Sequence, residues 1–238
     1  MLGYFFALKQ RQLYIILLLF LLGKQVTAQD ITAVVKAKEI VIGLGSSHYS
    51  GDLGSGYGSG QIMGSIGLAI NENKRLNSHI ILQAGAIRAN ELDYSYDDGT
   101  GTNTTPNESF NTAYFSLNFA LHLNLIDRDK FKLYLSQGIG FIRYTPKDEN
   151  GKALSDQSTT RALGETYRNM SIMIPSQLGF KYYLPNGYAV GVQTGFANSL
   201  TDYLDNISQW GKKDGNDNIF ITQIQLNIPI QFDAHENN

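Results

Sequence analysis

The chain has 238 residues, enough for one domain or two small ones, and a formal net charge of -2. This near-neutral balance offers no basic surface for nucleic acid, and the 42% hydrophobic content excludes a disordered chain. The absence of Cys excludes disulfide scaffolds, thiolate zinc sites and Cys nucleophiles, and the four His residues are too scattered to predict a metal site. The sequence therefore predicts no cofactor and no metal.

The N-terminal segment has the pattern of a secretory signal peptide. Basic residues precede an apolar run over 13–22, and a small-residue cleavage site ends at Ala28. The run is about ten residues long, against the ~20 that a transmembrane helix needs, so a retained helix is the weaker alternative. We expect residues 1–28 to be the signal peptide and 29–238 to be the exported β-barrel domain.

Alternation of apolar and polar residues dominates the rest of the chain. In the segment 111–123, Phe115, Leu117 and Phe119 alternate with Ser116 and Asn118, a period of two that is typical of a strand. Eight segments share this pattern: 39–47, 61–70, 79–91, 111–123, 131–144, 170–184, 188–198 and 219–232.

The connections between these strands alternate in length. The long ones lie at about 46–60, 92–110, 145–169 and 199–218, and the short ones near 71–78, 124–130 and 185–187, where Asn186-Gly187 is a hairpin signal. Long external loops and short periplasmic turns on an even number of strands are typical of outer-membrane barrels. The sequence predicts an all-β fold, an eight-stranded antiparallel up-and-down transmembrane β-barrel in the outer membrane of a Gram-negative cell.

A soluble lipocalin-like barrel is the alternative, and it would carry apolar side chains inside and charges outside. In this chain the strand positions that alternate with the apolar residues are uncharged: Gln83, Gly85, Ser116, Asn118, Ser136, Gly138, Gly140, Gln177, Gln193, Gln223, Gln225 and Asn227. These residues suit a hydrogen-bonded lumen, so we expect lipid outside and a filled interior without an open pore. Pro175 and Pro229 each lack the backbone N–H that a strand residue donates to its neighbouring strand. We therefore expect either a bulge at each proline or a strand that ends elsewhere than the ranges given above.

Charged residues within the strands are few. Arg88 and Arg143 share the apolar parity at the loop ends of their strands, where they could contact phosphates of lipopolysaccharide or other membrane lipids; snorkelling is the alternative. Lys132 and Lys181 face the lumen near its periplasmic end, where we expect them to snorkel into the opening without matching carboxylates.

Two further groups contain side chains that could support catalysis or metal binding. His122 shares the lumen parity with Ser116 and Asn118, but no acidic residue is evident to orient it, so lumen packing is favoured over catalysis. Asp202, Asp205, Asp214 and Asp217 could attract calcium, but their spacing does not match an EF-hand and we expect them to be solvated in an exposed loop.

Two segments resemble PorG-like outer-membrane barrels. The first strand and its exit carry a Tyr-x-Gly-Asp-Leu turn at Tyr49, Gly51, Asp52 and Leu53. The loop after the seventh strand carries a Thr-Asp-Tyr-Leu-Asp run at Thr201, Asp202, Tyr203, Leu204 and Asp205. The sequence departs from the family pattern at Asn206 and Ile207 and in a longer third loop.

This resemblance implies a non-enzymatic component of the type IX secretion machinery, in which PorG-like barrels associate with a periplasmic ring built by a lipoprotein and its partner. The implied role is assembly or anchoring. Topology would place the ring contact on the periplasmic turns, which carry Glu72, Lys74, Arg75, Asp127, Arg128 and Lys130. A generic structural or adhesive barrel, or less favourably a lipid-modifying barrel enzyme, is the alternative.

Overall fold

The computed structural model describes residues 38–54, 56–72, 74–97, 103–104, 106–185, 187–211 and 215–230, all within one compact unit, Lys36–Asn238. The predicted signal peptide, 1–28, and the predicted end of the last strand at Phe232 lie outside the described residues. Within those residues, no helix is long and apolar enough to cross a membrane.

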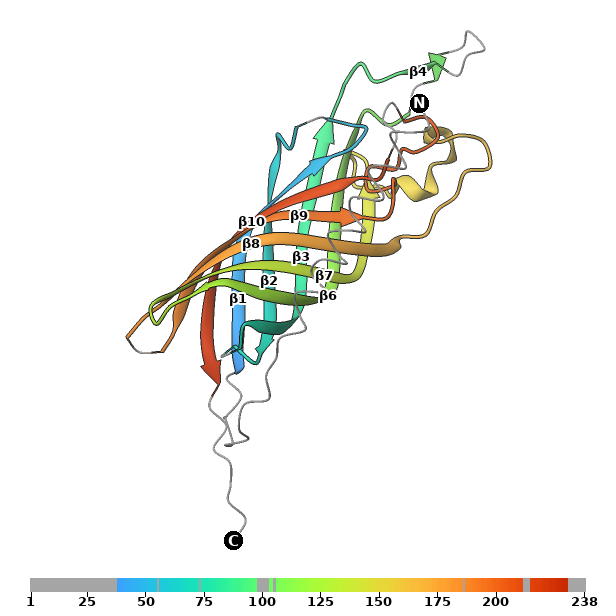
Figure 1. Cartoon of the computed structure of the whole chain (residues 1–238). Helices are drawn as coiled ribbons and strands as arrows, with labels where there is room; N and C mark the ends of the chain where they lie inside the picture. Colours follow the sequence, from blue (N-terminus) through green and yellow to red (C-terminus); the bar gives the residue numbers. More distant parts are fainter. Residues whose placement is uncertain are drawn as a thin grey trace, which may run out of the picture. The chain divides into compact units, whose positions relative to one another are not determined.

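Eight antiparallel strands close into a barrel in the order β1-β10-β9-β8-β7-β6-β3-β2 (Figure 1). They are β1 (Lys38–Ser50), β2 (Gly60–Ile70), β3 (Leu76–Asn90), β6 (Ser109–Asp127), β7 (Phe131–Lys147), β8 (Met170–Tyr183), β9 (Ala189–Ser199) and β10 (Asn218–Ile230). The predicted fold class is confirmed, and all eight predicted strands are present. The long connections also contain a short hairpin, β4 (Tyr96–Asp97) with β5 (Asn103–Thr104), and two 3-10 turns, η2 (Leu154–Asp156) and η3 (Ser158–Thr160).

The strands are staggered around the barrel. A path through paired residues that starts at Gly60 of β2 and passes once around the barrel returns to β2 at Ile70, ten residues further along. In an eight-stranded barrel such a stagger goes with strands tilted by roughly 35–45° and an interior that side chains can fill. At about 3.3 Å per residue, ten tilted residues project to roughly 25 Å, the height of a lipid-facing band.

The outward face of the barrel is apolar and the inward face is polar. On β6, Phe115, Leu117 and Phe119 are 50%, 46% and 48% exposed, whereas Ser116 and Asn118 between them are buried. A soluble barrel would have the opposite arrangement, so the outer surface requires lipid as its solvent. Closure pairs the backbone of every barrel strand with two neighbours, as a membrane interior requires.

The lumen is filled by hydrogen-bonded amides and hydroxyls. Gln193 Nε2 donates to Gln177 Oε1 at 2.7 Å, and Gln223 Nε2 donates to Gln193 Oε1 at 3.3 Å. Ser65 Oγ in turn donates to Gln223 Oε1 at 2.8 Å. This packing agrees with the expectation that the predicted lumen parity would fill the interior.

Pro175 differs from the expectation that the two strand prolines mark bulges or misplaced strand ends. Pro175 lies inside β8, where it interrupts pairing with β7 without a register shift. Gln137 Nε2 donates to the Pro175 carbonyl at 3.1 Å, and Ser176 Oγ donates to Gln137 Oε1 at 2.8 Å, so an outward side chain supplies the polar contacts that the ladder lacks there. Pro229 is paired opposite Glu39 without a bulge, one residue before β10 ends at Ile230, and the residues after Ile230 lie outside those described. A register shift occurs instead between β6 and β7, near residues 124–126.

Candidate functional site

The two motifs that carry the family resemblance meet at the loop end of the barrel. Tyr49, near the end of β1, donates its hydroxyl to Asp205 Oδ2 at 2.6 Å and to Asp217 Oδ1 at 2.8 Å. Asp205 lies in the loop between β9 and β10, and Asp217 lies just before β10. One phenol therefore joins two buried carboxylates to the first strand. We call this loop-end cluster, built around these three residues, the plug.

Backbone amides complete the plug. Leu53 N donates to Asp205 Oδ2 at 3.2 Å, and Leu204 N donates to Asp217 Oδ2 at 2.8 Å. Burial raises the pKa of Asp205 to about 7, against the hydrogen bonds from Tyr49 and the backbone that lower it. Burial and the neighbouring Asp205 carboxylate hold the pKa of Asp217 well above its usual value. The expectation that these loop carboxyls are solvated is therefore wrong for both residues.

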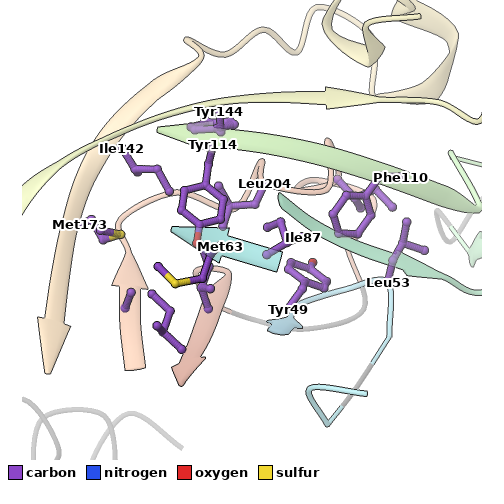
Figure 2. Packing of buried hydrophobic residues seen from close by; sticks show 14 of the residues in the cluster. Tyr49, Leu53, Met63, Ile87, Phe110, Tyr114, Ile142, Tyr144, Met173 and Leu204 are labelled. Carbon is purple, nitrogen blue, oxygen red and sulfur yellow. The ribbon is translucent and has the colours of Figure 1, made fainter. Parts of the chain in front are cut away.

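An apolar cluster surrounds the plug. Leu53 and Leu204, one from each motif, are fully buried and pack with Ile87 and Phe110 of the barrel wall (Figure 2). Gly51 has no room for a side chain, because a Cβ there would collide with the Tyr49 hydroxyl and the Asp217 carboxylate. The motif glycine thus allows the first loop to cross directly over the plug.

The remaining motif residues lie at the same end. Thr201 Oγ1 lies 3.0 Å from the Tyr144 hydroxyl, and the Tyr203 ring stacks on Tyr167 with centroids 4.5 Å apart. Asp52 is buried, and burial with the nearby Asp52 charge raises the pKa of Asp202 to about 6. Among the described residues no group of acidic and His side chains is arranged to hold a metal ion, and Asp214 lies outside them.

The two departures from the family pattern are physically linked. Asn206 accepts hydrogen bonds at Oδ1 from Arg161 Nη1 at 2.6 Å and from the Tyr167 hydroxyl at 2.9 Å, and both donors belong to the long third loop. Arg161 is buried and also donates to the Leu154 carbonyl at 2.8 Å. Asn206 has a φ of 78°, a left-handed conformation that Asn tolerates better than most residues. The extra length of the third loop is therefore braced against the plug at the position where the motif changes.

The opposite end of the lumen contains a buried charge network. Lys181 Nζ lies 2.8 Å from Glu39 Oε2 and 2.9 Å from Glu72 Oε2. Glu72 Oε1 also lies 2.9 Å from His79 Nε2, and Lys132 Nζ donates to the Glu72 carbonyl. The prediction that Lys132 and Lys181 snorkel without matching carboxylates is wrong, because Glu72 folds back from the β2–β3 turn into the barrel.

His122 is part of this end of the lumen and does not meet Ser116. Its ring stacks between His79, at a centroid distance of 3.5 Å, and Tyr134, at 4.6 Å. Ser116 lies six residues away on the same face of β6, roughly 20 Å along the strand, and donates to Gln83 Oε1. The packing interpretation of His122 agrees with this geometry.

A family model described as "Domain of unknown function (DUF6089)" matches residues 11–224. The chain belongs to the DUF6089 family. The match includes both plug motifs and seven of the barrel strands completely, and it ends within β10. No curated protein matches the sequence significantly.

The fold is similar to several solved outer-membrane barrels. They include Ail, the attachment invasion locus protein of Yersinia pestis (10% identity, 83% of this chain and 100% of that chain, TM-score 0.47), and neisserial surface protein A (13%, 80% and 96%, 0.47). The outer membrane enzyme PagL is similar over 81% of this chain and 99% of its own, at 16% identity and a TM-score of 0.34. The fold assignment depends on the strand topology of the chain itself.

In this DUF6089 protein the predicted surface residues have different environments. Lys74, Arg75, Asp127, Arg128 and Lys130 are exposed at the short turns. Their role in a ring contact stays a prediction. The prediction that Glu72 belongs to this contact surface is wrong, because its side chain is buried and points into the lumen.

Arg88 and Arg143 are exposed on the outward parity of β3 and β7, near the long loops, as expected. Their contact with lipid phosphates stays a prediction. Sequence reasoning missed the Lys181 network and the Tyr49 bridge. The inward parity of Glu39 on the first strand is the signal that could have indicated a partner for Lys181.

Proposed function

We propose that the chain is a non-catalytic outer-membrane barrel that acts as an assembly or anchoring component of the type IX secretion machinery. It would be exported by its signal peptide, cleaved after Ala28, and would contact the periplasmic ring lipoprotein and its partner through its short turns. The observation that carries the proposal is the meeting of the two PorG-like motifs in one plug, with Tyr49 bridging Asp205 and Asp217.

The plug supports a role in binding at the surfaces of the barrel over a role in conduction. Side chains occupy the lumen between the plug and the Lys181 network, so the surfaces free to meet a partner are the turns, the outer loops and the lipid-facing wall. Outer-membrane barrels place short turns in the periplasm and long loops outside the cell. A periplasmic ring would therefore meet the short turns.

Mixed charge at these turns suits a polar interface. Lys74 and Arg75 in the β2–β3 turn, and Arg128 and Lys130 in the β6–β7 turn, are exposed, with Asp127 beside the second pair. Exposed charges at an interface rim contribute mainly to the rate and specificity of association. We expect these cations to face acidic residues on the surface of the ring proteins.

Site-specific photo-crosslinking in cells tests this surface. A photoreactive residue at Arg128 should yield adducts with the ring lipoprotein or its partner, whereas the same residue at Lys152, in the third outer loop, should yield neither. A charge-reversal variant, Arg128→Glu with Lys130→Glu, should reduce recovery of the ring proteins relative to Lys152→Glu. Wild-type recovery together with the absence of adducts from Arg128 would refute the proposed contact.

A structural or adhesive role is the second candidate, and the outer loops favour it. A groove between the loops is lined by Asn107, Glu108, Asp148 and Gln157, and Leu163 is fully exposed at a turn of the third loop. Arg161 and Glu165 hold that turn in place through buried polar contacts. Adducts that form from the outer loops while the periplasmic turns yield none would favour this candidate.

A further inference from the structure

Four exposed cations gather on one wall of the barrel beside the long loops. Arg88 and Lys147 are cross-strand neighbours of the same residue, Asn111, on β3, β7 and β6 respectively. Because adjacent strands lie about 4.8 Å apart, the two cations are anchored roughly 10 Å from each other. Arg143, four residues before Lys147, has the same outward parity, and Arg168 is exposed two residues before β8. We call Arg88, Arg143, Lys147 and Arg168 the basic row.

The basic row lies directly above the apolar band. Arg143 is paired with Phe115 on β6 and with Met170 on β8, and these two side chains are 50% and 62% exposed. Towards the periplasm the wall continues with exposed Phe119 and Ile139. Since this band is the lipid-facing surface, the cations are placed at the level of the headgroups of the outer leaflet.

The cations of the basic row lack protein counter-ions. Within the described part of the chain, none of the four has a carboxylate at ion-pair distance, whereas Lys132 and Lys181 in the lumen do. The nearby Glu149 is engaged by Ser109, whose hydroxyl donates to Glu149 Oε1 at 3.1 Å. Exposed guanidinium and ammonium groups without carboxylate partners are available for an external anion.

The exposed cations of the strands also lie on one side of the barrel. β2, β9 and β10 contain no Lys or Arg, and β1 contains only Lys38, at its periplasmic end. At the loop end of that wall the exterior carries an aromatic group, in which Tyr57 packs against Phe196 and Phe220 with centroids 5.8 Å apart in both pairs. A general attraction to lipid headgroups would not require all the cations to share one wall.

We propose that the basic row is a binding site for the phosphate groups of lipopolysaccharide, with Arg88, Arg143 and Lys147 as the principal contacts and Arg168 at its edge. Guanidinium groups can bind phosphate oxygens in a bidentate manner, while the adjoining band, Phe115 and Ile139 included, packs against the acyl chains. The inference rests on the outer-membrane placement in the proposed function and not on the ring contact.

The test uses the full barrel in nanodiscs of phosphatidylethanolamine that contain either diphosphorylated or dephosphorylated lipid A, and it measures the lipid A retained per barrel by mass spectrometry. The variant combines Arg88→Gln, Arg143→Gln and Lys147→Gln. The control combines Lys74→Gln, Arg128→Gln and Lys152→Gln, which removes the same charge from exposed sites outside the basic row.

The wild type and the control should retain diphosphorylated lipid A equally, and the basic-row variant should bind it about a hundredfold more weakly, from about fivefold for each cation. Binding of dephosphorylated lipid A should not differ among the three proteins. Equal weakening in the control, or unchanged binding in the variant, would overturn the site. Heat-modifiable gel mobility verifies that all three are folded barrels. A wild-type chain that binds lipid A but recovers no ring proteins from cells would refute the ring contact alone and leave the lipid A site standing.

Discussion

The Tyr49 hydroxyl offers the sharpest test of the plug. Tyr49→Phe removes the donor to Asp205 and Asp217 but keeps the ring, which packs edge-on against Phe110 at a centroid distance of 4.7 Å. The two carboxylates then face each other with backbone amides as their remaining donors. The substitution therefore isolates the polar bridge from the apolar packing around it.

The expected loss of stability follows from the single proton of the Tyr49 hydroxyl. One hydroxyl proton serves two carboxyl oxygens, at 2.6 and 2.8 Å, so above about pH 7, where Asp205 is ionised, the loss is that of one strong bond to a charged acceptor. Such a hydrogen bond contributes about 1.5–3 kcal/mol to stability. Because Asp205 and Asp217 are fully buried, water does not replace the lost donor, so the cost lies in the upper part of this range. We expect the plug to lose about 2–3 kcal/mol while the strand ladder of the barrel is unaffected.

The single Trp of the chain makes the plug observable. Trp210 lies in the loop between β9 and β10, and its carbonyl accepts a hydrogen bond from the Tyr94 hydroxyl at 2.9 Å. In a urea titration in detergent micelles, Tyr49→Phe should lower the midpoint of the Trp210 fluorescence change and leave the far-ultraviolet circular dichroism midpoint in place. Tyr57→Phe, on the outer wall, is the matched control. An unchanged fluorescence midpoint, or equal shifts of both signals, would refute the plug as a separate structural unit.

Three further predictions concern the two ends of the lumen. The raised pKa of Asp205 means that the folded plug favours the neutral carboxyl. The stability that this preference contributes should be fully present below about pH 4 and be lost as the pH rises through about 7. A Trp210 urea midpoint that rises with pH would contradict this. Lys181→Met leaves the buried Glu39 without its cation and Glu72 with only His79 and Lys132, and should cost about 3–5 kcal/mol in barrel unfolding by circular dichroism; adding Glu39→Gln should restore part of it, and no recovery would argue against the network. Gly51→Ala should destabilise the plug by about 1–3 kcal/mol in the fluorescence titration, whereas Gly58→Ala, with open space around it, should not; equal effects would contradict the close approach.

The strands could be predicted from the sequence because each barrel strand has one face in lipid and one in the lumen. Phe115 and Ser116 on β6 are neighbours with opposite exposure, and this contrast repeats along the chain with a period of two. The periodic signal fades at the ends: β6 continues to Asp127, beyond the predicted end at residue 123, and β7 continues to Lys147. The extension of β6 pairs with the first residues of β7, and the extension of β7 pairs with residues 111–113 near the start of β6.

The two polar clusters could not be predicted in the same way. Tyr49 and Asp205 are joined only by barrel closure and by the return of the last long loop, and no local pattern encodes that approach. Glu72 belongs to a turn, where charge normally indicates solvation, and it enters the lumen because Lys181 and His79 are there to pair with it. The resemblance to PorG-like barrels did single out Tyr49 and Asp205 of the plug, although neither their mutual contact nor the part played by Asp217.

Membership of a secretion complex can be measured by affinity purification. A tagged full-length chain would be purified from mild-detergent outer membranes, and the accompanying proteins would be quantified by mass spectrometry against an unrelated small barrel with the same tag. We expect enrichment of the type IX ring lipoprotein and its partner over that control. Recovery of the intact barrel with neither protein above the control would refute membership of the complex.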